Sequence, residues 1–435
     1  MKMHWLICFV AFLLFVSKPA ICQESQSDGK QDPKVESKKD EKPLFDAVVE
    51  QMEKRYFDKE FRTNELPKIV ERYRPLAEKA ETLAEQRAVT FKFLSHFPAT
   101  HLGLLSEASY KQVMGELFGR KAPCFGMELI EINDQYFAHT ILEGGPAAKA
   151  GIKMGDRIVR IDKQPVRNHK RLDYRTDDSF LPDPPVHGLI CKENDVVEFE
   201  VDKGWGKIKN VSITATLYSS FEAAKASARV IEKDGMKVGY IHFWFIHING
   251  VQKLIQEKLE NEFKDCDAFI IDLRGRGGNG GACRGIANTV GGKTDSWSKP
   301  SVALIDRNTR SAKEVISLYF KREKSATLVG EKTAGAVIPA TFKKVGHDTV
   351  LMFPTFTLGK LTTALEGIGV EPDVAVEKWR PGIDHHDPIY KKGVEVAFAV
   401  AKKNLAKAKA ESENSKSADG ESTESESSDD GLRNE

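Results

Sequence analysis

Residues 268–281 read AFIIDLRGRGGNGG, and this stretch decides the fold. Ala268 to Leu273 is a strongly apolar run, which is typical of a buried strand in an α/β layer. The glycines that follow let the backbone approach a ligand closely. The stretch therefore predicts a buried strand that ends in a binding loop.

From Gly239 onward, apolar strand patterns alternate with helical ones, as expected for an α/β layer. Val302 to Asp306 is a second apolar strand, and a helix follows it from Ser311 to Lys321. The first N–H groups of a helix have no partner inside the helix and can hold an oxyanion. Ser311 is therefore a candidate nucleophile.

Two other interpretations apply to these motifs. Ser311 and Glu314 have the spacing of a capping box, which is a purely structural device. The glycine loop contains a formal GxGxxG match, which would indicate a nucleotide-binding enzyme. We disfavour the nucleotide site because Asp272 and Arg274 stand where that fingerprint has a plain strand end.

A second motif lies at residues 144–158, GGPAAKAGIKMGDRI. It predicts a turn, a short helix and a stop, with Gly151 and Gly155 in turn geometries and Asp156 capping the turn. The segment resembles a PDZ domain, a fold that binds peptide ends by strand addition. The resemblance places the carboxylate-binding loop at Phe125, Gly126 and Met127. A generic small β-domain is the alternative.

Taken in order along the chain, the motifs resemble those of the C-terminal processing (tail-specific) serine peptidases with a PDZ domain. The glycine loop and the Ser311 motif are followed by GEKTAG at 330–335 and by EGIGVEPD at 366–373. The resemblance extends from about Leu44 to Ala401. Many members of the family place a catalytic lysine directly after the TxG turn, where this chain has Ala336.

A serine hydroxyl needs a base, and the tricorn-core-like branch of the family provides one through a Ser-His-Glu arrangement. The resemblance makes His101 the base and Glu366 the residue that orients it. Thr100 is a candidate assisting residue, and His96 is a competing histidine. The predicted oxyanion hole consists of Gly277 or Gly278 together with the N–H of Ala312.

The start of the chain predicts export to the periplasm or the extracellular space. Lys2 precedes an apolar run from Trp5 to Val16, and Ala20-Ile21-Cys22 offers a cleavage site. A lipid anchor on Cys22 or an uncleaved apolar run is the alternative, and either would be the only route to a membrane. Four cysteines remain after cleavage, and their spacing fits no zinc pattern.

The net charge of +1 gives no indication of a nucleic-acid partner. No metal or organic cofactor is predicted, although His385-His386-Asp387 is open to interpretation as a weak metal site or as a polar helix start.

The length of 435 residues suits two or three domains. The fold class is multi-domain α/β, with these segments: signal peptide 1–22, disordered linker 23–42, N-terminal helical region 43–116, PDZ domain 117–216, crotonase-like peptidase core 217–402 and acidic disordered tail 403–435.

The sequence thus predicts an exported serine endopeptidase that cleaves peptides or unfolded proteins through an acyl-enzyme. Its PDZ domain would recognise peptide C-termini. The main rival is a catalytically inactive peptidase fold that binds peptides or apolar ligands, since the usual lysine is absent.

Overall fold

The computed structural model describes residues 42–167, 169–173, 186–204, 206–379 and 387–423. These residues belong to one compact unit that begins at Lys42. The predicted signal peptide and nearly all of the predicted linker lie outside the described residues. His385 and His386 of the candidate metal motif also lie outside them.

A six-stranded sheet with the order β12-β13-β14-β15-β16-β19 forms the centre of the C-terminal half. All neighbouring pairs are parallel except β12 with β13. Its strands are β12 (Arg229–Lys233), β13 (Met236–His242), β14 (Ala268–Asp272), β15 (Ser301–Ile305), β16 (Thr327–Gly330) and β19 (Val374–Ala375). The strands predicted at 268–273 and 302–306 are β14 and β15, which confirms both within one residue.

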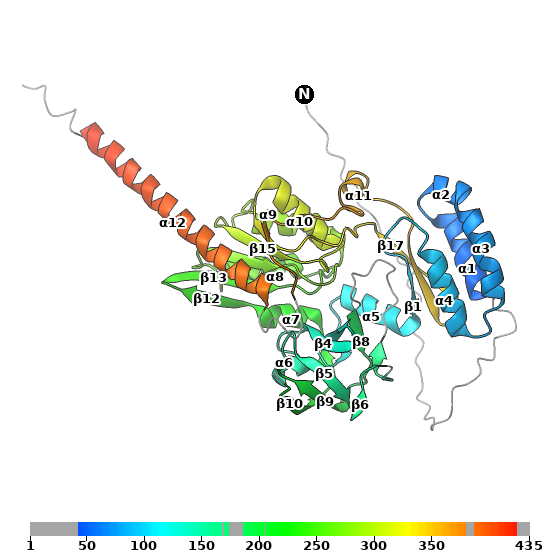
Figure 1. Cartoon of the computed structure of the whole chain (residues 1–435). Helices are drawn as coiled ribbons and strands as arrows, with labels where there is room; N and C mark the ends of the chain where they lie inside the picture. The colour runs from blue at the N-terminus through cyan, green and yellow to red at the C-terminus, as the bar shows by residue number, and fades with distance from the viewer. Residues whose placement is uncertain (1–41, 168, 174–185, 205, 380–386, 424–435) are drawn as a thin grey trace, which may run out of the picture. The chain divides into compact units, whose positions relative to one another are not determined.

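Helices cover both faces of this sheet (Figure 1). Alternate side chains of β14 point to opposite faces, so Phe269 and Ile271 pack in one apolar cluster while Ala268 and Ile270 pack in the other. The first cluster involves α8 (Val251–Glu260), α9 (Cys283–Val290) and α10 (Ala312–Glu323), and the second involves α12 (Pro388–Thr423). Burial on both faces explains why these strands are continuous apolar runs.

The end of the chain differs from the prediction. We expected disorder from residue 403, but α12 continues to Thr423. The predicted domain boundary at 402 therefore falls inside a helix. Residues 399–411 are rich in alanine and lysine, which have high helix propensity, and the helix is anchored on the sheet by Phe398 and Ala401.

A second, antiparallel sheet forms the predicted PDZ region, with the order β10-β9-β5-β4-β3-β8-β7 and β6 beside β5. Gly151 and Gly155 both have positive φ, and Asp156 accepts the Lys153 N–H at 2.7 Å, so the predicted turn is confirmed. The elements of this region are β3 (Met127–Ile132), β4 (Gln135–Ile141), α6 (Pro146–Lys149), β5 (Arg157–Ile161), β6 (Gln164–Pro165), β7 (Leu172–Asp173), β8 (Val186–Leu189), β9 (Val196–Asp202) and β10 (Ile208–Thr214). A short pair, β2 (Ala122–Cys124) and β11 (Thr216–Tyr218), stands at its two ends, and α7 (Ser220–Ser227) follows it.

The N-terminal region is helical, as predicted, but it shares a sheet with the core. Its helices are α1 (Leu44–Arg55), α2 (Lys59–Asn64), α3 (Leu66–Glu78), α4 (Leu83–Leu94) and α5 (Glu107–Leu117). The apolar face of α1, which carries Phe45, Val49 and Met52, is buried. Strand β1 (Gly103–Ser106) pairs with β18 (Thr349–Pro354), which in turn pairs with β17 (Ala340–Gly346). This pairing brings residues near 101 to the C-terminal half of the chain.

Phe353 provides a test of this shared core. Its side chain is fully buried among the N-terminal helices, and Phe356, three residues later, is 49% exposed. Phe353→Ala should lower the free energy of unfolding by about 3–5 kcal/mol because it leaves a cavity. Phe356→Ala should change it by less than about 0.5 kcal/mol. Urea denaturation measures both, and equal effects would contradict a shared core.

Candidate active site

Ser311 occupies a strained turn between β15 and α10. Its φ of 56° and ψ of −124° lie in a region that residues with a side chain rarely adopt. A serine on a sharp strand-to-helix turn is the arrangement known as a nucleophile elbow. The Ser311 N–H donates to Ala336 O at 2.7 Å and to Glu314 Oε2 at 3.3 Å. These two acceptors hold the strained backbone in place.

The preceding turn is fixed by its own polar side chains. Thr309 Oγ1 accepts the Asp306 N–H at 2.9 Å and donates to Leu273 O at 3.1 Å. Asp306 Oδ1 also accepts the N–H groups of Asn308 at 3.1 Å and Gly275 at 3.3 Å. The turn is thereby tied to the end of β14, so that the serine loop and the glycine loop form one unit.

The glycine loop packs directly against the candidate nucleophile. A Cβ atom added to Gly277 would lie 2.7 Å from Ser311 Cβ, so only glycine fits there. Gly278 has a φ of 147°, and its Cβ would lie 2.3 Å from Ile246 O. Ile246 anchors the loop, since its N–H donates to Gly277 O at 3.0 Å and its carbonyl accepts the Asn279 N–H at 2.7 Å. The predicted oxyanion residues Gly277 and Ala312 therefore both adjoin Ser311, while their role stays a prediction.

His101 and Glu366 meet at Thr100. Glu366 Oε1 accepts the Thr100 N–H at 2.8 Å, and Thr100 Oγ1 lies 3.0 Å from His101 Nδ1. The His101 ring is buried, with 9% exposure, and its φ is 57°. Thr100, predicted to assist by position alone, is thus the residue that contacts the imidazole on Nδ1.

The same glutamate reaches the serine side of the site. Glu366 Oε2 accepts the N–H groups of Val337 and Ile338, each at 2.9 Å. The residue before them, Ala336, accepts the Ser311 N–H. Backbone hydrogen bonds of Ser311 and of residues 336–338 therefore connect, through the peptide backbone of that segment, the loop of the predicted nucleophile with Glu366 and Thr100 beside the predicted base.

The competing histidine has a structural role. His96 Nε2 lies 2.7 Å from Tyr73 Oη, and the two rings pack at 5.3 Å between centroids. His96 thus belongs to the packing of α3 and α4. This geometry favours His101 as the candidate base.

A network of charged residues lies at the end of β14, where Asp272 is buried and Arg274 and Asp387 are partly exposed. Asp272 is fully buried and accepts Tyr240 Oη at 2.8 Å and Arg274 Nε at 2.9 Å. Burial acts to raise the pKa of Asp272, but Arg274 and His242 outweigh it and hold the pKa well below its usual range. Arg274 Nη1 also donates to both oxygens of Asp387 at 2.7 Å. The charges that conflicted with a dinucleotide fingerprint thus form an ion-pair network.

Asp387 also begins α12, because its Oδ1 accepts the Tyr390 N–H at 2.9 Å. This supports the polar helix start over the metal site for that residue. Within the described part of the chain, no group of three or more potential metal ligands is found.

Lys313, two residues after Ser311, is another buried residue with an ionisable side chain. Its side chain is fully buried, and its Nζ donates to Phe243 O and, at 2.8 Å, to Arg274 O. Burial lowers the pKa of Lys313 to about 7, although Asp306 and Asp272 act to raise it. Lys313 thereby ties α10 to the start of the glycine loop.

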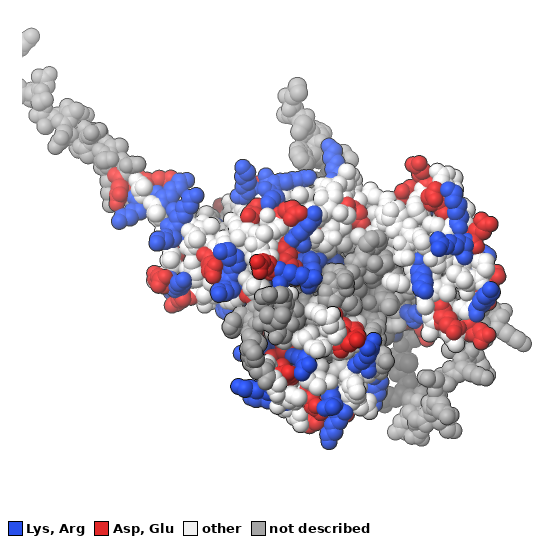
Figure 2. All heavy atoms as spheres, in the orientation of Figure 1, with Lys and Arg blue, Asp and Glu red and all other residues white. Residues whose placement is uncertain are grey.

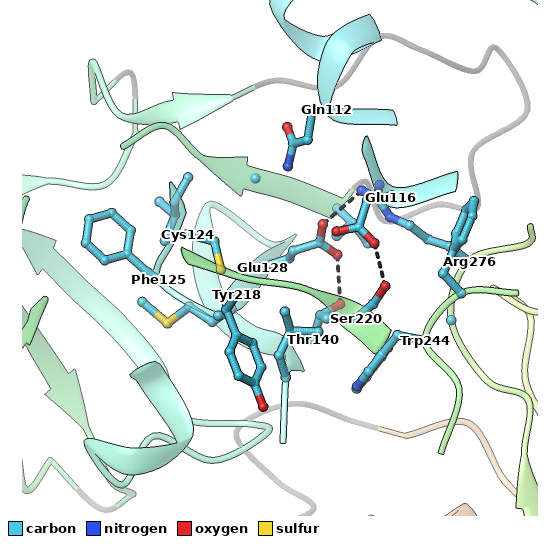
Figure 3. A pocket seen from close by; sticks show the side chains of 18 of the residues that line it. Gln112, Glu116, Cys124, Phe125, Glu128, Thr140, Tyr218, Ser220, Trp244 and Arg276 are labelled. Carbon is cyan, nitrogen blue, oxygen red and sulfur yellow. Dashed lines mark hydrogen bonds and ion pairs between the residues drawn. The ribbon is translucent and has the colours of Figure 1, made fainter. Parts of the chain in front are cut away.

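A pocket joins the predicted PDZ loop to the loops around Ser311 (Figure 3). Phe125, Gly126 and Met127 line one side of it, and Arg276 and Arg310 line the other. Arg276 Nη2 donates to Glu128 Oε1 at 2.8 Å, which connects the two sides. Glu128 Oε2 in turn accepts the Thr140 hydroxyl at 2.9 Å.

The fold and this site define the class: an α/β protein with a serine elbow and an attached PDZ domain. Residues 237–376 match the model of peptidase family S41, and residues 138–175 match that of a PDZ domain. The chain therefore contains a peptidase family S41 domain and a PDZ domain. This confirms the predicted family and fold class, and it places the glycine run inside a peptidase domain.

Two curated relatives and one solved structure illustrate the similarity. The carboxy-terminal-processing protease of Bartonella bacilliformis is 26% identical over 59% of this chain and 62% of its own length. The tricorn protease of Thermoplasma volcanium is 22% identical over 84% of this chain and 37% of its own length. The photosystem II D1 C-terminal processing protease has a TM-score of 0.45 and 19% identity, covering 81% of this chain and 95% of that one. The chain thus spans less than two thirds of the length of each of these two curated relatives.

Lys313 predicts a pH-dependent contribution to stability. Its pKa is depressed in the folded state, so between pH 7 and about 10 the unfolded chain binds more protons and the free energy of unfolding rises with pH. Lys313→Met removes the titrating amine and with it this pH-dependent contribution to the free energy of unfolding. The difference in unfolding free energy between wild type and Lys313→Met should therefore shift in favour of the wild type by up to about 1.4 kcal/mol per pH unit between pH 7 and 9.

Urea denaturation at several pH values measures this difference. Lys324→Met, at the exposed end of the same helix, is the control and should show a constant difference from wild type. A pH-independent difference for Lys313→Met would contradict a neutral buried amine.

Proposed function

We propose that the chain is an exported serine endopeptidase that cleaves peptides or unfolded proteins through an acyl-enzyme on Ser311. One observation carries the proposal: Ser311 stands on a strained elbow and is connected by hydrogen bonds, through residues 336–338 and Glu366, to Thr100 and His101. A strained backbone conformation costs about 1–3 kcal/mol, and such conformations cluster at active sites, where the surrounding contacts hold them in place.

In the proposed mechanism, Ser311 Oγ attacks the scissile carbonyl and His101 accepts its proton. His101 then gives the proton to the leaving amine, and water hydrolyses the acyl-enzyme by the reverse sequence. Thr100 holds the ring from the Nδ1 side, which leaves Nε2 as the nitrogen for proton transfer. Glu366 acts through the backbone of Thr100 and favours the protonated imidazole that forms during the reaction.

Stabilisation of the oxyanion would come from backbone N–H groups of Ala312, at the start of α10, and of Gly277 or Gly278. The positive end of α10 favours negative charge at this position. Preorganised donors of this kind account for about a 10²–10³-fold rate effect each in serine peptidases. The close packing of Gly277 on Ser311 supports this assignment.

The pocket between the PDZ loop and the core supports a role in substrate capture. Its walls combine apolar side chains such as Phe125, Trp244 and Leu189 with backbone of the Gly126 turn. An extended peptide end could add to the PDZ sheet there and lead toward Ser311. The names of the relatives, which describe processing of carboxyl termini, support a peptide C-terminus as the ligand.

Two further observations concern location and partners. Among the described residues, no helix is both long and apolar enough to cross a membrane. On the face shown in Figure 2, basic and acidic side chains are interspersed. Export rests on the N-terminal sequence, with its apolar run from Trp5 to Val16.

A catalytically inactive binding protein is the rival function, because Ala336 stands at the position of the family's lysine. Ala336 is buried and both of its backbone groups are used at the elbow, since its N–H donates to Glu314 Oε2 and its carbonyl accepts the Ser311 N–H. The backbone of Ala336 thus helps to hold the elbow, and this favours a residue elsewhere as the base.

Hydrolysis of denatured casein tests the proposal. Ser311→Ala and His101→Ala should each reduce kcat/KM by at least about 10³-fold, because the nucleophile and base act as one unit. His96→Ala is the matched histidine control and should retain activity within about threefold. Equal hydrolysis by all four proteins would exclude the triad, and peptide binding by a wild type without turnover would favour the rival.

Gly277 predicts a second effect on catalysis. Gly277→Ala places a methyl group against Ser311 Cβ and the Arg310 carbonyl, and should displace the elbow. A displacement of this order costs about 10²-fold in kcat with little change in KM. Gly280→Ala, in the same loop, points into open space and should leave both constants unchanged. Comparable kinetics for the two variants would contradict the proposed position of the oxyanion loop.

A further inference from the structure

Glu314 is a fully buried carboxylate in the first turn of α10, three residues after Ser311. We propose that it is a positioning residue, which holds the nucleophile elbow and the segment 333–338 in register with each other. The inference deepens the proposed function and rests on it, because the register matters only if Ser311 and His101 react together.

Four donors converge on this one carboxylate. Oε1 accepts Thr333 Oγ1 at 2.6 Å and the Gly335 N–H at 2.7 Å. Oε2 accepts the Ala336 N–H at 2.8 Å and the Ser311 N–H at 3.3 Å. An ionised carboxylate accepts about four hydrogen bonds, whereas an amide in its place would turn its NH₂ group toward two of these donors.

A capping role accounts for only part of this arrangement. The capping box requires a bond between Glu314 and the N–H of Ser311. The other three donors belong to the turn at 333–336, which is outside the helix. Glu314 therefore joins two separate segments and does more than end a helix.

The turn at 333–336 leads directly to the base side of the site. The next two residues donate their N–H groups to Glu366, which also accepts the Thr100 N–H beside His101. On its other side, Thr333 is held by the Val370 N–H at 2.7 Å. A shift of the turn would therefore move Glu366 and Thr100 relative to Ser311.

Burial and hydrogen bonding act on Glu314 in opposite directions. Burial raises the pKa of Glu314 above its usual range, although the bonds from Thr333, Ala336, Gly335 and Ser311 act to lower it. Protonation would add an O–H among four donors and leave one of them without an acceptor. The buried Glu314 carboxylate can therefore hold the turn at 333–336 only because these four donors satisfy its oxygens.

Kinetics of Glu314→Gln and Glu314→Asp on denatured casein test the inference. Glu314→Gln should lower kcat by at least about 10²-fold and change KM by less than about threefold, because no residue of the turn lines the pocket proposed to capture substrate. Glu314→Asp keeps the charge and should recover part of the lost kcat. Glu323→Gln is the control, since it makes the same change at the surface of the same helix, where Glu323 pairs with Arg284 and Lys293.

Rates are normalised to the native fraction, measured by tryptophan fluorescence at the assay temperature. Wild-type kcat in folded Glu314→Gln would overturn the inference. If Glu314→Gln does not fold, Glu314→Asp decides: a kcat at least tenfold below wild type with unchanged KM supports the inference, and a wild-type kcat overturns it.

Amide hydrogen exchange separates this inference from the proposed function. Glu314→Gln turns its NH₂ group toward one of the amides of Gly335 and Ala336, and Glu314→Asp is one CH₂ too short to reach both. Either variant should speed exchange at least about tenfold at one or both of these amides and leave exchange in β14 unchanged. If the wild type shows no Ser311-dependent hydrolysis, the proposed function fails, and exchange alone then tests whether Glu314 holds the turn. Unchanged exchange at both amides would overturn the inference independently of activity.

Discussion

The need to satisfy buried charges at the carboxyl edge of the parallel sheet governs the arrangement of this molecule. Asp272, Lys313 and Glu314 are fully buried, and each is held by several hydrogen bonds from different segments. A buried charge without partners would cost several kcal/mol, so each segment must stay in place. The strained turn of Ser311 persists because these contacts surround it.

The two residues after Ala312, Lys313 and Glu314, hydrogen-bond to different segments on opposite sides of α10 in the sequence. Lys313 binds carbonyl groups of Phe243 and Arg274, on the side of the glycine loop. Glu314 binds N–H groups on the side of the turn at 333–336. The Lys313 amine donates hydrogen bonds and the Glu314 carboxylate accepts them, so two adjacent residues can fix two loops that lie far apart in the sequence.

Much of the fold was predictable from local patterns. The buried strands β14 and β15, the turn at Asp156 and the apolar face of α1 follow from periodicity and glycine placement, which act within a few residues. Ser311 was a candidate from its place at a helix start, whereas His101 and Glu366 came from resemblance to a family, because nothing in the residues around His101 indicates a base. The extension of α12 beyond residue 402 was missed, since a charged composition outweighed helix propensity in that prediction.

The sequence by itself determined the order of the motifs, the two sheet types and the presence of a serine at a helix start. It could not distinguish a capping serine from a serine on a strained elbow, because both have the pattern Ser-x-x-Glu. Only the tertiary structure decided this, through the positive φ of Ser311 and the contact with Gly277. It also decided that Thr100 and Glu366, 266 residues apart, lie together. Pairing of β1 with β18 and the hydrogen bonds of the Glu366 carboxylate to residues 100, 337 and 338 are long-range events, and local residue patterns carry no information about them.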